Sequence, residues 1–270
     1  MVLLYLKISQ SCRMLRSRII PVLLVRNKGL VKTTKFGDDK YVGDPINAVR
    51  IFNEKEADEL TVFDIDASVN ESEPDYKMIE NLASECRMPL CYGGGVKTLQ
   101  QALNILSLGV EKVALSSALI SNPSLVNDIA AQVGNQSVVA VLDVKKRLLG
   151  GYKVFTHNGK KASNVDLVDF CKDLEVRGVG EIVINSIDRD GTMQGYDKAL
   201  IKKVKEAVNV PVTLCGGASD HADLGQTIAE FGPIGVAAGS LFVFKGKYRA
   251  VLISYPNSND KEKIFSEGQK

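Results

Sequence analysis

Residues Pro89–Val96, Pro-Leu-Cys-Tyr-Gly-Gly-Gly-Val, have the pattern of a buried strand that ends in glycines. The segment after them begins a helix, because Thr98 and Gln101 are spaced as a capping box. Glycines at such a junction let bare backbone N–H groups approach an anion at the positive end of the helix. The stretch therefore predicts a strand, a phosphate-binding turn and a helix, in that order.

The same pattern occurs a second time, because Pro211–Ala218 reads Pro-Val-Thr-Leu-Cys-Gly-Gly-Ala. A duplicated set of strands predicts two half-barrels with four strand–helix units each. It also predicts two phosphate sites, one in each half, which a substrate with a phosphate at each end would bridge. Other stretches with a partner at nearly the same spacing are Ile20–Val25 with Val139–Val144, Glu59–Asp66 with Glu181–Asp188, and Val113–Ser117 with Val236–Ser240.

Strand-type runs and helical patterns alternate along the chain, with a polar hairpin expected at Lys145–Lys161. Helices are expected to begin at Asp44, Asn122, Asp197 and Ser219, besides the one at Thr98. The fold class is therefore α/β, a (βα)8 TIM barrel built from two half-barrel repeats, with a doubly wound open sheet as the alternative. The expected strands are Ile19–Val25, Glu59–Ile65, Pro89–Val96, Lys112–Leu115, Val138–Val144, Glu181–Ile187, Val212–Leu214 and Gly235–Ala238.

Length and composition limit the class of protein. The chain has 270 residues, 45% of them hydrophobic and 24% charged, which suits one large α/β barrel or two smaller domains. We interpret residues 1–13 as a disordered leader or an upstream start, with a signal peptide as the alternative, and residues 14–270 as one barrel domain. A formal net charge of only +2 argues against a nucleic-acid surface, and nothing in the sequence calls for a membrane.

Cysteine and histidine usage indicates the compartment and the cofactor class. The five cysteines are odd in number and lack Cys-x-x-Cys spacing, which favours a reduced, cytoplasmic protein. His157 and His221 are the only histidines in the sequence, so neither a zinc site nor another metal site is expected. We expect no cofactor.

Asp143 closes the fifth expected strand and is the first candidate for a general acid or base. Working groups in such barrels stand at the carboxyl ends of the strands, which would place this carboxylate between the two phosphate sites. The structural alternative is a loop cap or an ion-pair partner of Lys32 or Lys145. Its mate in the repeat is Leu24, so a mechanism that needs an acid from each half has lost one of them.

Polar residues at other strand ends are candidates for phosphate binding. Gly191, in Ile187–Thr192, allows a tight turn in which Asp188 could orient substrate hydroxyls and Asp190 the loop, although an ordinary Asx-turn explains the same residues. Serine hydroxyls beside expected helix starts also suit phosphate oxygens, or else they cap the helices. These serines are Ser116, Ser117 and Ser240.

Charged residues begin four of the expected strands, at the opposite end of the barrel. Charges at strand starts usually form a solvated rim. If their side chains converge on the barrel axis instead, the alternating signs would make a salt-bridge ring that seals the base. The four residues are Arg18, Glu59, Lys112 and Glu181.

Together these residues make the sequence similar to the cyclase subunit of imidazole glycerol phosphate synthase, from Met14 to Phe244. The resemblance implies a barrel that accepts ammonia from a glutaminase subunit, docked on the amino-end face in a heterodimer. It implies that a bis-phosphorylated ribulosyl intermediate becomes imidazole glycerol phosphate and an aminoimidazole carboxamide ribotide. The motifs that carry it are Arg18-Ile-Ile-Pro, Gly43-Asp-Pro, Asp58-Glu-Leu, Tyr92-Gly-Gly-Gly, Phe155-Thr-His-Asn-Gly-Lys-Lys, Ser186-Ile-Asp-Arg-Asp-Gly-Thr and Gly195-Tyr-Asp.

The resemblance also implies roles for single residues. Asp143 matches one catalytic aspartate, and Lys32 matches a lysine of a mobile first loop. The four charges at the strand starts match the gate of an ammonia channel, in place of a solvated rim. The implied phosphate sites are Gly95, Ser116 and Ser117 at one end, and Asp190, Gly191, Gly217, Gly239 and Ser240 at the other.

Some positions depart from the family pattern. Leu24 stands where the family has its second catalytic aspartate, Ser116 and Asn185 replace the usual residues, and residues 245–256 do not resemble the usual final helix. A leucine transfers no protons, so cyclisation should fall by roughly two orders of magnitude or more if the family mechanism is kept.

An intact gate with a changed mouth resembles the paralogues associated with lipopolysaccharide and other surface-polysaccharide clusters. Such paralogues imply a different role, in which ammonia from a glutaminase passes to a separate amidotransferase that acts on a nucleotide sugar. The cyclase and the ammonia-channelling paralogue are therefore alternatives, and a phosphosugar isomerase that acts alone is a third.

Overall fold

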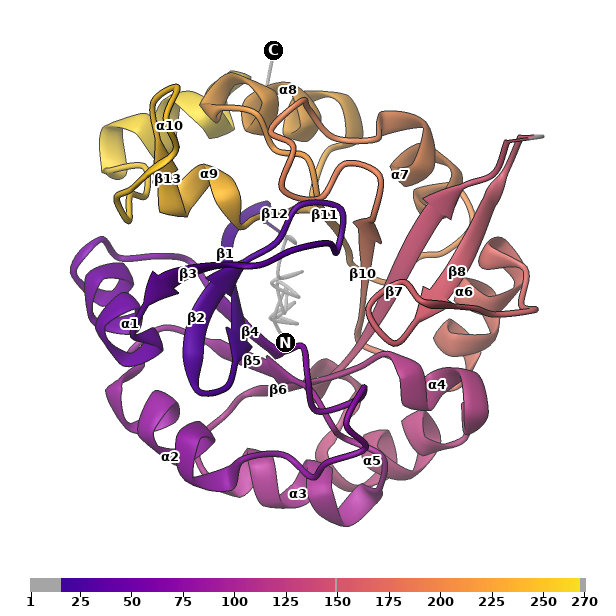
Figure 1. Ribbon diagram of the computed structural model, residues 1–270. Helices are drawn as coiled ribbons and strands as arrows, with labels where there is room; N and C mark the ends of the chain where they lie inside the picture. Colours follow the sequence, from indigo (N-terminus) through magenta and orange to yellow (C-terminus); the bar gives the residue numbers. More distant parts are fainter. Residues whose placement is uncertain (1–15, 149, 268–270) are drawn as a thin grey trace, which may run out of the picture.

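The computed structural model describes residues 16–148 and 150–267, so the interpretation of residues 1–13 concerns positions outside the described residues. Its centre is a closed barrel of parallel strands with helices around it (Figure 1). The barrel closes because β7 pairs with β10 and β12 pairs with β1, which excludes the open doubly wound sheet and confirms the TIM barrel. The barrel strands are β1 (Arg18–Arg26), β4 (Leu60–Asp64), β5 (Leu90–Gly93), β6 (Lys112–Leu115), β7 (Val138–Lys146), β10 (Glu181–Ser186), β11 (Val212–Cys215) and β12 (Gly235–Ala238).

Helices surround the barrel, and several begin where the sequence predicts. The Asp44 carboxylate accepts a hydrogen bond from the N–H of Asn47 at the start of α1, and Thr98 and Gln101 form the capping box of α3. Asp197 caps α7 as expected. The longer helices are α1 (Pro45–Glu54), α2 (Tyr76–Glu85), α3 (Leu99–Ser107), α5 (Leu125–Val133), α6 (Leu167–Val176), α7 (Lys198–Lys205), α8 (His221–Phe231) and α10 (Ser258–Glu267), and the shorter ones are α4 (Ser117–Ser121), α9 (Ser240–Val243) and the 3-10 turn Asn135–Ser137.

Two expected helix starts are wrong. Asp220, and not Ser219, caps α8, because its carboxylate accepts a hydrogen bond from the N–H of Asp223 at 2.9 Å. Residues 122–124 form a turn, in which the Asn122 side chain accepts a hydrogen bond from the Ser124 hydroxyl, so α5 begins only at Leu125.

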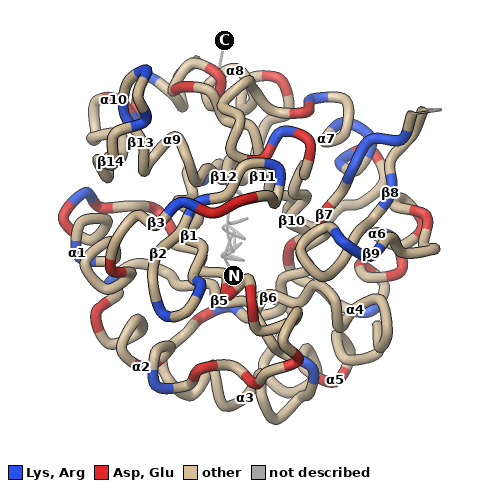
Figure 2. The backbone as a smooth tube through the Cα atoms, in the orientation of Figure 1, with Lys and Arg blue, Asp and Glu red and all other residues tan. Residues whose placement is uncertain are grey.

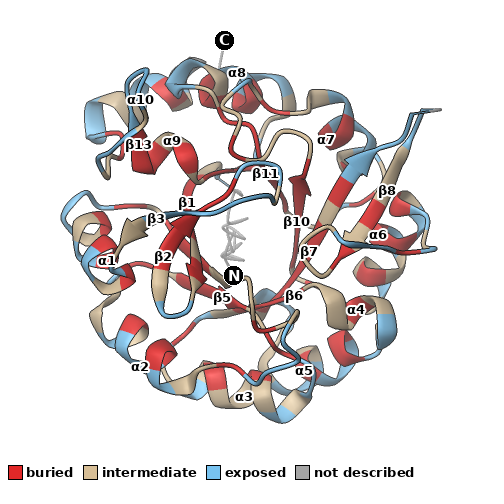
Figure 3. Cartoon of the chain, viewed as in Figure 1, coloured by how far each residue is buried: buried red, intermediate tan, exposed pale blue. Residues whose placement is uncertain are grey.

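Apolar side chains fill both sides of the strands. Figure 3 shows that much of the barrel is made of buried residues. Successive residues of a strand point to opposite faces, so Leu23 and Val25 of β1 pack against the helices while Val22 and Leu24 face the barrel axis. The inner cluster that fills the barrel comprises Ile20, Val22, Cys91, Ala114, Val139, Val141, Val183, Cys215 and Ala237, with Leu24 and Phe63 packed on it.

Hairpins extend two barrel strands on the carboxyl-end face. The polar hairpin expected at Lys145–Lys161 is confirmed, since β8 (Tyr152–Thr156) pairs with β7 and β9 (Lys161–Ala162) pairs with β8. A second hairpin, β2 (Gly29–Lys32) with β3 (Lys40–Gly43), continues β1 and was not expected from the sequence. Each hairpin follows the first strand of a half-barrel, so the two are equivalent in the repeat.

The C-terminal segment differs from a simple final helix, as its sequence indicates. After α9 it forms a short hairpin of β13 (Phe244–Lys245) and β14 (Ala250–Val251), and only then α10, which packs against α8. Acidic and basic residues are interspersed around the molecule (Figure 2). No helix within the described ranges is long and apolar enough to cross a membrane.

Candidate functional site

A cavity of about 320 Å³, which we call the mouth, opens at the carboxyl ends of the barrel strands. This is the end where barrels of this kind carry their working groups. With the exception of Asp188, the structure brings the residues expected there, from both halves of the repeat, into its lining. These residues are Leu24, Lys32, Gly95, Ser116, Ser117, Asp143, Asp190, Gly191, Gly217, Gly239 and Ser240.

Asp143 lies near the end of β7, and its carboxylate accepts a hydrogen bond of 3.0 Å from the side-chain amide of Asn185 on β10. Burial raises the pKa of Asp143 to about 7. Across the described part of the chain, no lysine or arginine nitrogen forms an ion pair with this carboxylate. The group can therefore hold or release a proton near neutral pH, which suits a general acid or base.

The repeat mates of Asp143 and Asn185 are both apolar. Asp143 is in register with Asn185 on the neighbouring strand, just as Leu24 on β1 is in register with Phe63 on β4. Leu24 and Phe63 line the mouth and pack on the inner apolar cluster. At this pair of equivalent positions, the second half of the repeat thus offers an acid with an amide, and the first half offers hydrocarbon. Phe63 was not singled out from the sequence, although the repeat aligns it with Asn185.

Lys32 projects from strand β2, where only 4% of it is exposed, and its ammonium donates a hydrogen bond to the carbonyl of Val22. Burial lowers the pKa of Lys32 to about 8, although the charge of Asp190 opposes the shift. Gly239 leaves room for this ammonium, because a Cβ there would collide with Nζ. The lysine expected in a loop is therefore held in a strand, beside Gly239 of the second expected phosphate site.

Asp190 and Gly191 fasten the turn after β10 to the segment after β2. The Asp190 carboxylate accepts a hydrogen bond of 3.1 Å from the hydroxyl of Thr33, and burial raises its pKa. Gly191 has a φ of +68°, and a Cβ on it would lie 2.2 Å from the Thr33 carbonyl oxygen. Asp188, expected to orient substrate, instead accepts a hydrogen bond from the N–H of Lys146.

The serine hydroxyls at the strand ends are available to a ligand rather than used as caps. Ser116 directly precedes α4 and makes no side-chain capping bond. Ser117 is the first residue of α4, and both serines line the mouth. Ser240 begins α9, is buried, and accepts a hydrogen bond of 3.3 Å from Arg249. No group of three or more potential metal ligands occurs among the residues that the structure describes.

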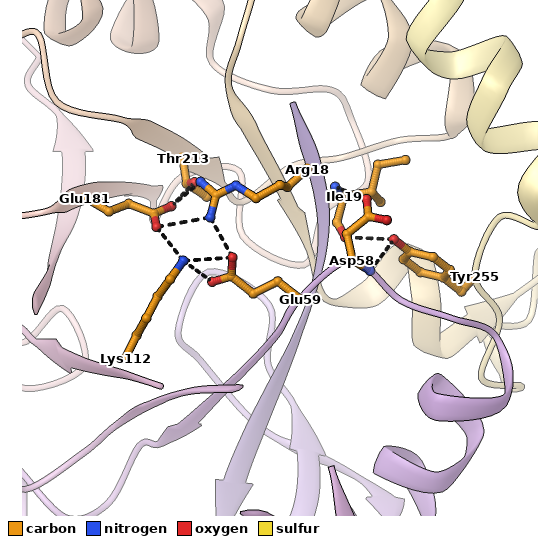
Figure 4. Close-up of polar contacts among 8 residues, drawn as sticks. All are labelled: Arg18, Ile19, Asp58, Glu59, Lys112, Glu181, Thr213 and Tyr255. Carbon is orange, nitrogen blue, oxygen red and sulfur yellow. Dashed lines mark hydrogen bonds and ion pairs between the residues drawn. The ribbon is translucent and has the colours of Figure 1, made fainter. Parts of the chain in front are cut away.

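The four charged residues at the strand starts converge on the barrel axis and form what we call the basal ring (Figure 4). Arg18 contacts Glu59 at 2.5 Å and Glu181 at 2.8 Å, while Lys112 contacts Glu59 at 2.8 Å and Glu181 at 3.0 Å. The Thr213 hydroxyl donates a further bond to Glu181. Charges alternate around the ring, so each side chain has an opposite charge on both sides.

Electrostatics in the basal ring favours the ionised state of all the groups whose shift is resolved. Burial opposes ionisation of Glu181, but the charges of Arg18 and Lys112 outweigh it and lower the pKa of this carboxyl to about 2. Burial likewise opposes the charge on Arg18 and Lys112, and the two glutamates outweigh it and raise the pKa of both. Glu59 and Glu181 are 4% and 5% exposed, so the expectation of a solvated rim is wrong.

A second, much smaller cavity of about 10 Å³ lies inside the barrel between the basal ring and the mouth. Glu59 and Glu181 line it at the ring, and Val22 and Phe63 line both this cavity and the mouth. Its volume is about that needed for one water molecule. The small cavity thus lies on the barrel axis between the two ends, has mostly apolar walls, and shares two lining residues with the mouth.

Tyr255 ties the C-terminal segment to two neighbours of the basal ring (Figure 4). Its hydroxyl donates to the carbonyl of Ile19 at 2.9 Å and accepts from the N–H of Asp58 at 3.1 Å. The Asp58 carboxylate accepts from the N–H of Ile19 and pairs with Lys261 of α10 at 3.0 Å. Ile19 and Asp58 directly precede or follow ring residues, so one tyrosine fixes the starts of β1 and β4.

Comparison with known proteins agrees with this architecture. A family model described as "Histidine biosynthesis protein" matches residues 18–249. A protein of Vibrio vulnificus, provisionally named imidazole glycerol phosphate synthase subunit hisF3, is 59% identical over 254 residues, which cover 94% of this chain and 98% of the relative. A Pseudomonas aeruginosa protein, provisionally named as subunit hisF2 of the same enzyme, is 53% identical over 91% of this chain and 98% of its own length.

A relative whose name carries no such qualification is more distant. The imidazole glycerol phosphate synthase subunit HisF of Hyphomonas neptunium is 40% identical over 232 residues, covering 86% of this chain and 91% of its own.

Proposed function

The chain belongs to the family of histidine biosynthesis proteins, as a HisF-like cyclase subunit of imidazole glycerol phosphate synthase, and we propose that it accepts ammonia from a glutaminase subunit. The observation that carries the proposal is the basal ring, in which each of the four side chains is paired with two others, below a small cavity that shares Val22 and Phe63 with the mouth. If these residues only formed a solvated rim, their side chains would not need to converge on the axis, and Glu59 and Glu181 would not need to be buried.

The proposed path runs from the base to the mouth. A glutaminase docked on the amino-end face, in a heterodimer, releases ammonia at the basal ring, which acts as its gate. Ammonia crosses the small cavity as the neutral molecule, because a charge is costly between walls such as Val22 and Phe63. It then meets a bis-phosphorylated substrate in the mouth.

The substrate is held by its two ends. Ser116, Ser117 and Gly95 bind one phosphate, and Gly217, Gly239 and Ser240 bind the other, because the backbone N–H groups and hydroxyls there suit phosphate oxygens. Asp143, whose pKa burial raises to about 7, moves protons between the two ends. Lys32 supplies positive charge beside Gly239.

A second candidate is favoured by the apolar pair of Leu24 and Phe63. In this candidate the barrel activates the glutaminase and passes the ammonia on to a third protein, an amidotransferase that acts on a nucleotide sugar for surface polysaccharide. Hydrocarbon at the position of a proton-transfer group leaves the conduit intact and removes only the cyclisation chemistry.

The experiment has two assays. Stimulation of glutamine hydrolysis by the added barrel tests the part that both candidates share. Lys112→Ala should abolish the stimulation, whereas its absence with the wild type would contradict both candidates. The second assay supplies an ammonium salt and the bis-phosphorylated ribulosyl intermediate, and follows imidazole glycerol phosphate.

Variants at position 24 separate the two candidates. If cyclisation is the function, Leu24→Asp should raise the rate by about tenfold or more, whereas Leu24→Asn, with the same shape and no proton to transfer, should not. A flat trace with every variant, together with retained glutaminase stimulation, supports the conduit.

The cysteines support a reducing compartment, which we propose is the cytoplasm. Cys86, Cys91, Cys171 and Cys215 are all free, and burial raises the pKa of their thiols.

A further inference from the structure

The β13–β14 hairpin follows α9 and contacts the lining of the mouth through one side chain. Its turn carries Arg249, whose guanidinium Nη2 donates a hydrogen bond of 3.3 Å to the hydroxyl of Ser240. Ser240 is buried and lines the mouth next to Gly239. A residue from the C-terminal segment thus reaches the phosphate site that the barrel strands build.

A second cation joins Arg249 from the opposite side of the sequence. Lys40 of β3 donates a hydrogen bond of 3.2 Å to the backbone carbonyl of Arg249. This bond joins the β2–β3 hairpin to the β13–β14 hairpin. Both cations lie over the ring of Phe244, with Lys40 Nζ 5.2 Å and Arg249 Cζ 4.7 Å from its centroid. Figure 2 shows basic segments of the chain at both places.

These two positive charges have no direct ion-pair partner among the described residues, although the charge of Arg249 acts to lower the pKa of the Asp190 carboxyl in the mouth. Within the described ranges, neither Arg249 nor Lys40 has a carboxylate oxygen within 4.0 Å, although like charges held close together repel. Arg26, which lines the mouth, shows the contrast, since it is paired with Asp39 at 2.6 Å and with Asp66 at 3.0 Å. An anion is the partner that completes the Arg249 cluster.

We infer that Arg249 is a phosphate ligand, which together with Lys40 binds the phosphoryl group of a substrate at the Ser240 end of the mouth. A guanidinium suits this task because its planar fork of N–H donors matches two phosphate oxygens. The Arg249 guanidinium already lies at hydrogen-bond distance from the Ser240 hydroxyl, which would bind the same phosphoryl group. This inference rests on the proposed function to the extent that the ligand carries a phosphate at that end.

The test is a titration of ¹⁵N-labelled protein with inorganic phosphate at constant ionic strength, followed by NMR through the amides of Gly217, Gly239 and Ser240. The amides of Gly95 and Ser117 report on the other end in the same spectra. Arg249→Gln should weaken binding at the Ser240 end about tenfold and leave the Gly95 end unchanged, because a charge-assisted bond to phosphate is lost.

Two further variants keep the test clear of folding defects. Arg249→Lys keeps the charge and loses the fork, so it should fall between the wild type and Arg249→Gln. Lys247→Gln removes an exposed charge of the same turn and should bind phosphate as the wild type does.

Two results would overturn the inference, and they can be told apart. Wild-type affinity at the Ser240 end in Arg249→Gln would refute the role of Arg249 alone. Absence of phosphate binding at both ends of the wild type would refute the phosphate sites of the proposed function as well.

Discussion

The base and the mouth of the barrel are built from the same repeat, but they use it differently. At the base, Glu59 and Glu181 are repeat mates that keep the same charge, and Arg18 and Lys112 stand between them. At the mouth, the polar pair of Asp143 and Asn185 has an apolar pair as its mate. Each ring residue is bonded to two others, so a change to one would leave buried charges unpaired. The two pairs at the mouth lie on different strand pairs, so one could become apolar without disturbing the other.

The two ends also differ in how their carboxyls respond to pH. The cations of the basal ring lower the pKa of Glu181 from 4.5 to about 2, while burial raises the pKa of Asp143 from 3.8 to about 7. Glu181 therefore contributes stability that is present above pH 4.5 and is lost as the pH falls toward 2. Asp143 has the opposite sign, because the folded protein loses stability as the pH rises from 3.8 toward 7.

The largest effect is expected from Glu181→Gln in the basal ring. The change leaves Arg18 and Lys112 with one carboxylate between them, in a buried site, so unfolding in urea at pH 7 should show a loss of about 3 kcal/mol or more. The difference from the wild type should shrink as the pH falls from 4.5 toward 2, where the wild-type carboxyl also becomes neutral. Glutaminase stimulation should be lost as well.

A matched control is available on the same edge of the barrel. Glu111 is exposed and adjacent to Lys112, so Glu111→Gln should change stability by about 0.5 kcal/mol at most. If Glu181→Gln lost no more stability than this control, the ion pairs of the basal ring would not stabilise the fold, and the prediction would be wrong.

A smaller effect, of opposite sign, is expected from Asp143→Asn in the mouth. The amide keeps the shape and removes the buried carboxylate, so the variant should be more stable than the wild type by about 1–3 kcal/mol at pH 8. Well below pH 3.8 the two proteins should unfold at the same urea concentration, because the wild-type group is then protonated in both the folded and the unfolded state. A variant that is less stable at pH 8 would mean that the charged form of Asp143 is stabilised by the fold. Phosphate binding in the mouth should survive the change.

The sequence predicts the barrel and the mouth lining well because both depend on local patterns that occur twice. Apolar runs of strand length and the two glycine junctions place Gly95 and Gly217 at strand ends, where the structure has them. The sequence also supplies the charges of the basal ring. Their convergence, however, depends on the closure of the barrel, and strand-start charges alone do not distinguish a ring from a rim.

Features that depend on distant contacts could not be predicted in the same way. The β2–β3 hairpin forms because Leu24 pairs with Val31, and its segment, rich in Lys, Thr, Gly and Asp, has no strand pattern of its own. Tyr255 bonds to Ile19, and Arg249 to Lys40, across almost the whole chain. Ser219 and Asp220 are both good capping residues, so local preference alone could not choose between them.

The smallest effect is expected from Tyr255→Phe, which tests whether the C-terminal segment holds the basal ring in place. The ring of Tyr255 would keep its packing against Phe52 and Phe242, and only its two hydrogen bonds would be lost. Stability should fall by about 1–2 kcal/mol, because the carbonyl of Ile19 is left without its partner.

Tyr196→Phe is the control for Tyr255→Phe, since Tyr196 is similarly buried and its hydroxyl donates to the carbonyl of Ala237 on β12 and not to a neighbour in sequence of a ring residue. Both variants should lose similar stability. Only Tyr255→Phe should weaken binding to the proposed glutaminase subunit, by about threefold, because Ile19 and Asp58 flank Arg18 and Glu59. Equal glutaminase affinity in the two variants would show that Tyr255 stabilises the fold without positioning the ring. The C-terminal segment would then serve the mouth, through Arg249, and not the base.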